Sequence, residues 1–188
     1  MPVKTWIGSE LNPMDGLFTL NEACLSEIEN ALCLIRDNPL PLLMLHPSNF
    51  YMPRCKELIN SVLDCLENGF GFCLLDRLPI EDMTDNEAKS IFWLLSQMLG
   101  RPVAQKWCDG RMLYSVTDLG RPSGNGVRPD VTNEEQSFHT DNSYNICPPN
   151  IVGLLCLQPS MSGGLSRVVN MKAVLERMEI TNKTHTER

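Results

Sequence analysis

The sequence predicts an α+β fold in which helices come first and short strands follow. Three stretches carry apolar residues at helical spacing, and they cover residues 21–37, 53–68 and 84–99. Short apolar runs bounded by Gly, Pro or Asp predict strands over residues 70–75, 112–116, 151–157 and 166–169. A last short helix is expected over residues 171–178. With 188 residues, the chain is long enough to bury a core of its own.

Local signals mark where the helices begin and end. Residues 1–17 are interrupted by Pro and Gly and predict an irregular arm. Asn21 is a suitable cap for the first helix, and Gly69 stands where a glycine would end the second. Thr84 and Glu87 form a capping box in front of the third helix. These signals predict helices with defined ends.

Composition and charge exclude some classes of function. The formal net charge of -7 argues against non-specific binding to nucleic acid or to anionic membranes, since both require a basic surface. The first residues contain no apolar signal segment, and no apolar run is long enough to span a bilayer. We therefore expect a cytoplasmic protein without nucleic-acid or membrane partners, and a homo-oligomer stays open.

The eight cysteines predict neither a zinc ribbon nor a disulfide framework. No two cysteines have the C-x2-4-C spacing, and no secretory signal precedes them. Cys73 and Cys156 lie inside apolar runs. We interpret the cysteines as free thiols that serve as small buried apolar groups.

The stretch Ser137–Ser143 contains His139 and Asp141, two residues apart. If the stretch is extended, these two side chains lie on one face, while Thr140 points away. An imidazole nitrogen and a carboxylate oxygen that converge are two of the three ligands of the facial triad that holds non-haem Fe(II). A histidine and an aspartate in a polar turn are the alternative interpretation.

A second motif, Gly163-Gly164-Leu165-Ser166, follows the His139-Thr140-Asp141 motif along the chain. The two motifs and the order of elements over residues 55–180 resemble the N-terminal half of the taurine dioxygenase-like (TauD/TfdA) family. The spacing between the two motifs also resembles that of the family. The resemblance implies a partial double-stranded β-helix, a jelly roll of the clavaminate synthase-like kind, preceded by N-terminal helices.

The resemblance also implies chemistry and partners. Members of the family are Fe(II)- and 2-oxoglutarate-dependent dioxygenases that use O2 to oxidise a C–H bond of a small molecule. His139 and Asp141 match the family's metal ligands. Ser166 matches the residue whose hydroxyl contacts 2-oxoglutarate, and a strand-edge hydroxyl without that role is the alternative.

Residues near the two motifs are candidates for the substrate pocket. Trp107, Arg111 and Tyr114 precede the metal motif, and Asn142 and Ser143 follow it directly. The alternatives are aromatic residues that belong to the core and turn residues that only shape the backbone. The Gly- and Pro-rich residues 119–134 predict a long loop beside this site.

We expect three parts: an N-terminal helical arm over residues 1–52, an incomplete dioxygenase domain over residues 53–180, and a polar tail over residues 181–188. The family's second histidine ligand and the arginine that pairs with 2-oxoglutarate lie far downstream of the first motif. Only His46 and His185 remain as third ligands here, and each is otherwise a surface or turn histidine.

We therefore expect a chain truncated before the second histidine ligand, with unpaired strand edges that favour aggregation. A catalytically inactive fragment, or an interaction module of the same fold, is the alternative to a working dioxygenase.

Overall fold

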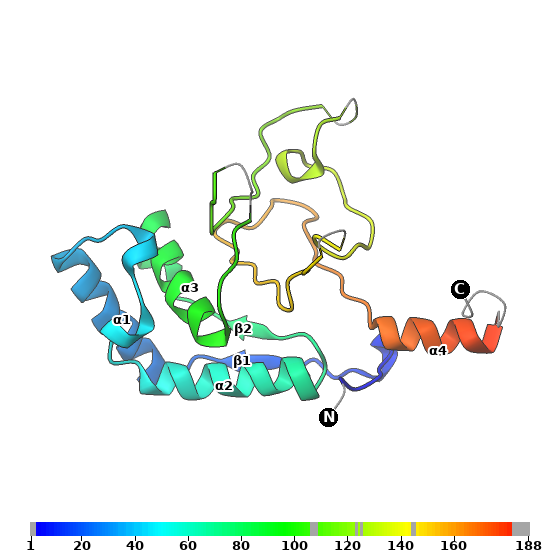
Figure 1. Cartoon of the computed structure of the whole chain (residues 1–188), viewed down its shortest axis with the longest axis horizontal. Coiled ribbons are helices and arrows are strands. Elements are labelled where there is room, and N and C mark those ends of the chain that lie inside the picture. Colours follow the sequence, from blue (N-terminus) through cyan, green and yellow to red (C-terminus); the bar gives the residue numbers. More distant parts are fainter. Residues whose placement is uncertain (1–2, 106–108, 123, 125, 144–145, 182–188) are drawn as a thin grey trace. The chain divides into compact units, whose positions relative to one another are not determined.

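The computed structural model describes residues 3–105, 109–122, 124, 126–143 and 146–181. Two compact units divide the chain. The helical unit comprises residues 1–100 and 168–188, and the loop unit comprises residues 101–167. The regular elements of the described residues are α1 (Glu22–Asp37), α2 (Pro53–Asn68), α3 (Asp85–Leu99), α4 (Met171–Thr181), β1 (Leu17–Thr19) and β2 (Leu74–Asp76), as shown in Figure 1. This content of helices and strands confirms the predicted α+β class.

The helices begin and end where the local signals predict. The Asn21 side chain accepts a hydrogen bond from the Cys24 amide at 2.9 Å and so caps α1. Gly69 is the C-cap residue of α2. In front of α3, the Thr84 hydroxyl and the Glu87 carboxylate complete a capping box. These contacts satisfy backbone groups that have no partner inside a helix.

The helices α1, α2 and α3 pack against one another around an apolar core. Ile28 of α1 and Ile91 and Leu94 of α3 are fully buried. Glu27 of α1 reaches the start of α2, where its two carboxylate oxygens accept hydrogen bonds from consecutive backbone amides at 2.9 Å each. Negative charge is favourable at a helix N-terminus, so this contact joins two helices as well as capping one.

The strands β1 and β2 pair in parallel, with Leu17 opposite Leu74 and Thr19 opposite Asp76. This pairing corrects two predictions, because residue 17 was assigned to an irregular arm and the strand over residues 70–75 lies instead at Leu74–Asp76. A three-residue strand carries little pattern of its own. Its partner, far along the chain, is what makes it a strand.

The helix α4 confirms the short helix predicted near the end of the chain and extends it to Thr181. Asn170 precedes α4 and is buried. Its Oδ1 accepts a hydrogen bond from the Ala173 amide at 3.0 Å, while its Nδ2 donates to the Lys4 carbonyl at 2.8 Å. Asn170 therefore caps α4 and attaches it to the N-terminal arm.

The loop unit corrects three further predictions, since its described residues contain no strand. The runs 112–116 and 151–157 have no regular structure, and neither does the run 166–169, which begins in the loop unit and ends in the helical unit. Leu154 is 78% exposed, and Cys156 is exposed too, contrary to its expected burial. A strand requires a hydrogen-bonded neighbour, and none of these runs has a ladder partner among the described residues.

The described residues of the Gly- and Pro-rich segment 119–134 form a loop with one short 3-10 turn, Pro129–Val131, in agreement with the predicted loop. No helix in the described part of the chain is long and apolar enough to cross a membrane.

Candidate functional site

His139 and Asp141 face each other in the loop unit. The distance from His139 Nε2 to Asp141 Oδ1 is 3.2 Å. The other ring nitrogen, Nδ1, lies 2.8 Å from the Ser137 carbonyl oxygen. Because a carbonyl oxygen can only accept, Nδ1 must carry the proton of this bond. The bond fixes the ring orientation and directs Nε2 toward the carboxylate.

The pair is open to solvent, since the His139 and Asp141 side chains are 52% and 51% exposed. The hydrogen bond to the Ser137 carbonyl raises the pKa of His139 above its ordinary value. Partial loss of hydration lowers this pKa by less, and the nearby Asp141 charge raises it further. Without a metal ion, a proton on Nε2 satisfies both groups. A cation can take the place of that proton, because both atoms offer lone pairs to one point.

A tight turn follows the pair and holds the carboxylate beside the ring. Asn142 has φ +50°, in the left-handed region that asparagine tolerates better than most residues. Asn142 and Ser143 belong to this turn, together with Asp141. Both were predicted to line the substrate pocket, and their position directly after the carboxylate keeps them near the candidate metal ligands.

The donor set fits two positions of an Fe(II) site. Two donors that each lie about 2.1 Å from one ion, at right angles to each other, are about 3 Å apart. The observed separation of 3.2 Å is close to that value. However, the described residues contain no group of three or more His, Cys, Asp and Glu side chains that could hold a metal ion.

Of the two histidines considered as third ligands, one makes a local contact and the other lies outside the described residues. His46 belongs to the helical unit, where its Nδ1 lies 2.7 Å from the Ser48 hydroxyl and accepts from the Ser48 amide at 3.2 Å. His46 therefore caps a 3-10 turn. His185 lies outside the described residues.

Ser166 follows a turn that depends on two glycines. Gly163 and Gly164 have φ values of +76° and +68°, where a side chain is strained. The Ser160 hydroxyl donates to the Gly163 carbonyl at 3.0 Å, and a Cβ on Gly164 would lie only 2.4 Å from that hydroxyl oxygen. Ser166 itself is exposed. No hydrogen bond among the described residues joins Ser166 to the His139–Asp141 pair.

The remaining pocket candidates contact acidic neighbours. Arg111 pairs with Asp109, from Nη2 to Oδ2 at 3.2 Å. The Tyr114 side chain is close enough to Asp130 to help lower the pKa of its carboxyl group. Trp107 lies outside the described residues.

Asp130 is a residue that no sequence motif singled out. Its side chain is buried and pairs with Arg128 Nε at 2.9 Å. Burial opposes ionisation of Asp130, but the Tyr114 and Arg128 contacts outweigh it and lower the pKa of the carboxyl. The Thr117 amide also donates to the Asp130 carbonyl at 3.3 Å. Asp130 thus attaches the long loop to the segment that carries Tyr114.

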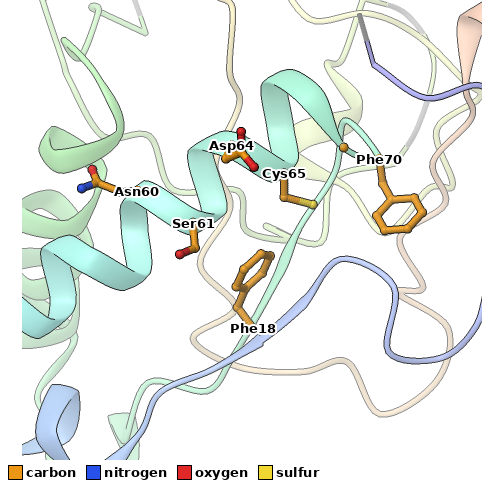
Figure 2. Close-up of a pocket in the computed structure, with 7 residues that line it drawn as sticks. Phe18, Asn60, Ser61, Asp64, Cys65 and Phe70 are labelled. Atoms are coloured by element: carbon orange, nitrogen blue, oxygen red, sulfur yellow. The ribbon is translucent and has the colours of Figure 1, made fainter. Parts of the chain in front are cut away.

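An open groove of about 540 Å³ lies on the helical unit, between the C-terminal half of α2 and β1 (Figure 2). None of the predicted site residues lines this groove. Its lining consists of Phe18, Asn60, Ser61, Asp64, Cys65, Gly69 and Phe70.

Comparisons with known proteins identify the same family that the His139-Thr140-Asp141 motif resembles. Residues 47–188 match the family described as "Taurine catabolism dioxygenase TauD, TfdA family". The chain is also similar to FR-33289 synthase of Streptomyces rubellomurinus, with 30% identity over 149 residues. That alignment covers 78% of this chain but 42% of the relative. The matched region contains both motifs and most of this sequence, and the chain belongs to the TauD/TfdA dioxygenase family.

Proposed function

We propose that this chain carries part of the active site of an Fe(II)- and 2-oxoglutarate-dependent dioxygenase that oxidises a small molecule. The observation that carries this proposal is the convergence of His139 Nε2 and Asp141 Oδ1 at 3.2 Å in a chain of this family. Membership of the TauD/TfdA family supports an oxygenase. We propose Fe(II) as its metal and 2-oxoglutarate as its co-substrate.

His139 and Asp141 would hold the iron through Nε2 and Oδ1. The Ser137 carbonyl would keep the imidazole in the tautomer that leaves Nε2 free for the metal, because it accepts the proton on Nδ1. When bound, the iron supplies the activation of O2 that amino acid side chains cannot perform. The third protein donor remains to be assigned, since the described residues offer no three-ligand cluster.

Ser166 is proposed to contact the carboxylate of 2-oxoglutarate through its hydroxyl. The preceding glycine turn supports this role, since it fixes the backbone two residues earlier and leaves Ser166 exposed. We keep Trp107, Arg111, Tyr114, Asn142 and Ser143 as the proposed lining of the substrate pocket. The TauD/TfdA family match supports a small-molecule substrate, and the similar relative is named a synthase.

For the fold, we propose that residues 53–180 contribute to a double-stranded β-helix after an arm over residues 1–52, with residues 181–188 as a tail. The family match, which begins at residue 47, supports this start. The extended apolar runs of the loop unit are the segments that such a fold would pair into strands.

Metal binding tests the proposal directly. We expect anaerobic titration with Fe(II) to show one site on the chain, and His139→Ala and Asp141→Ala each to weaken binding at least 10-fold, because each removes one of two observed donors. His46→Ala is the matched control and should bind as the wild type. Unchanged affinity in His139→Ala would overturn the assignment.

An interaction module without catalysis is the second candidate, and the lack of a three-ligand cluster in the described residues favours it. The two functions differ in one measurement. The dioxygenase forms succinate from 2-oxoglutarate in the presence of O2 and Fe(II), and His139→Ala abolishes this. An interaction module forms none.

A further inference from the structure

The chain reverses direction after α2 and returns along the same helix. Both the Gly69 amide, at 3.0 Å, and the Gly71 amide, at 3.2 Å, donate to the Cys65 carbonyl. Gly71 has φ +76°, and a Cβ on Gly69 would lie 2.7 Å from that same carbonyl oxygen. Glycine is therefore required at this reversal. The tight turn brings Cys73 back beside the last turns of α2.

Each of the two cysteines of this reversal, Cys65 and Cys73, donates a hydrogen bond to a backbone carbonyl near the other cysteine. The Cys65 thiol donates to the Phe72 carbonyl at 3.7 Å, one residue before Cys73. The Cys73 thiol donates to the Val62 carbonyl at 3.6 Å, three residues before Cys65 and one turn below it on α2. The Cys65 thiol is also close enough to Cys73 to help raise the pKa of the Cys73 thiol. Both sulfur atoms therefore occupy the narrow space between α2 and the returning chain.

The groove on the helical unit gives solvent access to this thiol pair. Cys65 is part of its lining, and Figure 2 shows the sulfur directed toward the chain that returns from Gly69 to β2. Cys65 and Cys73 are both partly exposed, whereas Cys24 and Cys55 are buried. A small oxidant can thus reach Cys65 without unfolding of the core.

We propose that Cys65 and Cys73 form an oxidisable dithiol, which a peroxide converts into a disulfide that joins the end of α2 to the segment before β2. The reaction uses no residue of the proposed iron site. Burial, followed by the contact with Cys65, raises the pKa of Cys73 to about 12, so that Cys73 is almost entirely protonated at neutral pH. Cys65 lines the open groove, where dissolved peroxide can reach its sulfur, and it is therefore the sulfur that reacts first.

The reaction needs one peroxide for each disulfide. The Cys65 sulfur attacks one oxygen of hydrogen peroxide, the O–O bond breaks, and Cys65 becomes a sulfenic acid as water leaves. The Cys73 sulfur then attacks the Cys65 sulfur, the S–O bond breaks, and the hydroxyl leaves with the Cys73 proton as a second water. The two thiols lose two electrons in total, and the peroxide gains them.

Peptide mapping of the full chain tests the proposal. The folded chain is treated with hydrogen peroxide, its remaining thiols are blocked with N-ethylmaleimide, and it is cleaved after glutamate without reduction. Cleavage after Glu57, Glu67 and Glu81 separates Cys65 and Cys73 into the fragments 58–67 and 68–81. We expect mass spectrometry to find most of these two fragments joined, and separated again after reduction.

Cys55 provides an internal control, because it precedes Cys65 on the same helix and a bridge between them would join fragment 58–67 to fragment 30–57. Fragment 30–57 also contains Cys33, so this product is compared in the Cys33→Ser variant, where Cys55 is the one cysteine of that fragment. In the folded chain, ten residues of helix hold these two cysteines about 15 Å apart, too far for a disulfide. In guanidinium the two loops are of similar length, and both bridges should form.

Variants separate this pair from general cysteine oxidation. Cys65→Ser and Cys73→Ser should each abolish the joined fragments, while Cys33→Ser, at an exposed cysteine of α1, should leave their yield unchanged. Two results would overturn the proposal. One is Cys65 and Cys73 blocked separately in the oxidised folded chain, and the other is a folded chain with the same mixture of bridges as the denatured chain.

Discussion

The helical unit and the loop unit show opposite relations between sequence pattern and structure. In the helical unit, apolar side chains such as Leu94 are fully buried, and caps such as Asn21 satisfy the helix ends. In the loop unit, apolar side chains such as Leu154 are exposed. A helix makes its backbone hydrogen bonds within one segment, whereas a strand needs a second segment. Apolar residues therefore form a core in the helical unit and exposed runs in the loop unit.

The sharpest test of this difference is to replace one leucine by alanine in each unit and to compare the two losses of stability. We expect Leu94→Ala to destabilise the chain by about 2–5 kcal/mol, because it leaves a cavity between packed helices. Leu154→Ala should change stability by less than about 0.5 kcal/mol. Urea denaturation followed by circular dichroism measures both. The small effect of Leu154→Ala follows from the exposure of Leu154 described above. The proposed double-stranded β-helix would instead pack the run 151–157, and a loss in Leu154→Ala as large as that in Leu94→Ala would show that it does so in solution.

The next effect concerns the contact between α1 and α2. Glu27→Gln keeps the shape of the side chain but replaces one of its two acceptor oxygens by a donor that faces a backbone amide. We expect a loss of about 1–3 kcal/mol in the free energy of unfolding, because a buried amide loses its partner. Glu29→Gln, at an exposed position of the same helix, is the control and should have almost no effect. Equal stability of the two variants would show that the contact of Glu27 with α2 does not stabilise the fold.

A third prediction compares one glycine from each unit. Gly164→Ala places a side chain at φ +68° and against Ser160, and should weaken its turn by about 1–2 kcal/mol. Gly100→Ala, at an extended position with no atom within 4 Å of the added carbon, should cost much less. Hydrogen exchange of the amides of residues 160–167 measures the first effect. No acceleration there would mean that the glycine turn is not formed in solution.

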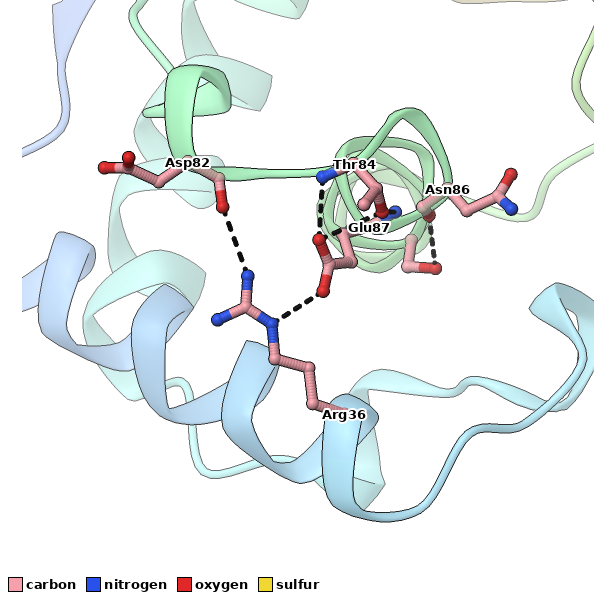
Figure 3. Close-up of polar contacts among 6 residues, drawn as sticks. Arg36, Asp82, Thr84, Asn86 and Glu87 are labelled. Carbon is pink, nitrogen blue, oxygen red and sulfur yellow. Dashed lines mark hydrogen bonds and ion pairs between the residues drawn. The ribbon is translucent and has the colours of Figure 1, made fainter.

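The smallest predicted effect is the pH dependence of the capping box of α3. Arg36 Nε lies 2.6 Å from Glu87 Oε1, and the Thr84 amide donates to Oε2 at 2.7 Å (Figure 3). The Arg36 hydrogen bond, followed by that from Thr84, lowers the pKa of Glu87 from 4.5 to about 2. The stabilisation is therefore complete above about pH 4.5 and is lost as the pH falls toward about 2.

Thermal unfolding between pH 2 and 6 measures this effect against Glu87→Gln. The difference in melting temperature between the wild type and the variant should shrink as the pH falls through this range. A constant difference would mean that the ionised form of Glu87 has no special role. The solvent around Arg36, whose side chain is 49% exposed, keeps the effect small.

The sequence predicted the helices well because their signals are local. The capping box of Thr84 and Glu87 spans a single turn, and Gly69 directly follows the residues that it terminates. The strands were predicted poorly. β1 was missed because only its pairing with β2 makes it a strand, and the runs in the loop unit were assigned from apolar content alone.

The candidate site divides in the same way. His139 and Asp141 are two residues apart, so a local pattern was enough to select them together. Asp130 was missed because its contact with Tyr114 joins segments that no spacing rule connects. Cys65 and Cys73 lie on two sides of a reversal whose geometry becomes apparent only in the fold.

By itself, the sequence determined the positions of the helices, the caps that bound them, the two motifs and the family to which the chain belongs. The tertiary structure decided which strands pair, which apolar residues are buried, and which thiols meet. The physical reason is the range of the interactions. Caps, helical faces and a His-x-Asp pair are fixed by neighbours along the chain, whereas strand pairing, burial and thiol contacts depend on segments that only folding brings together.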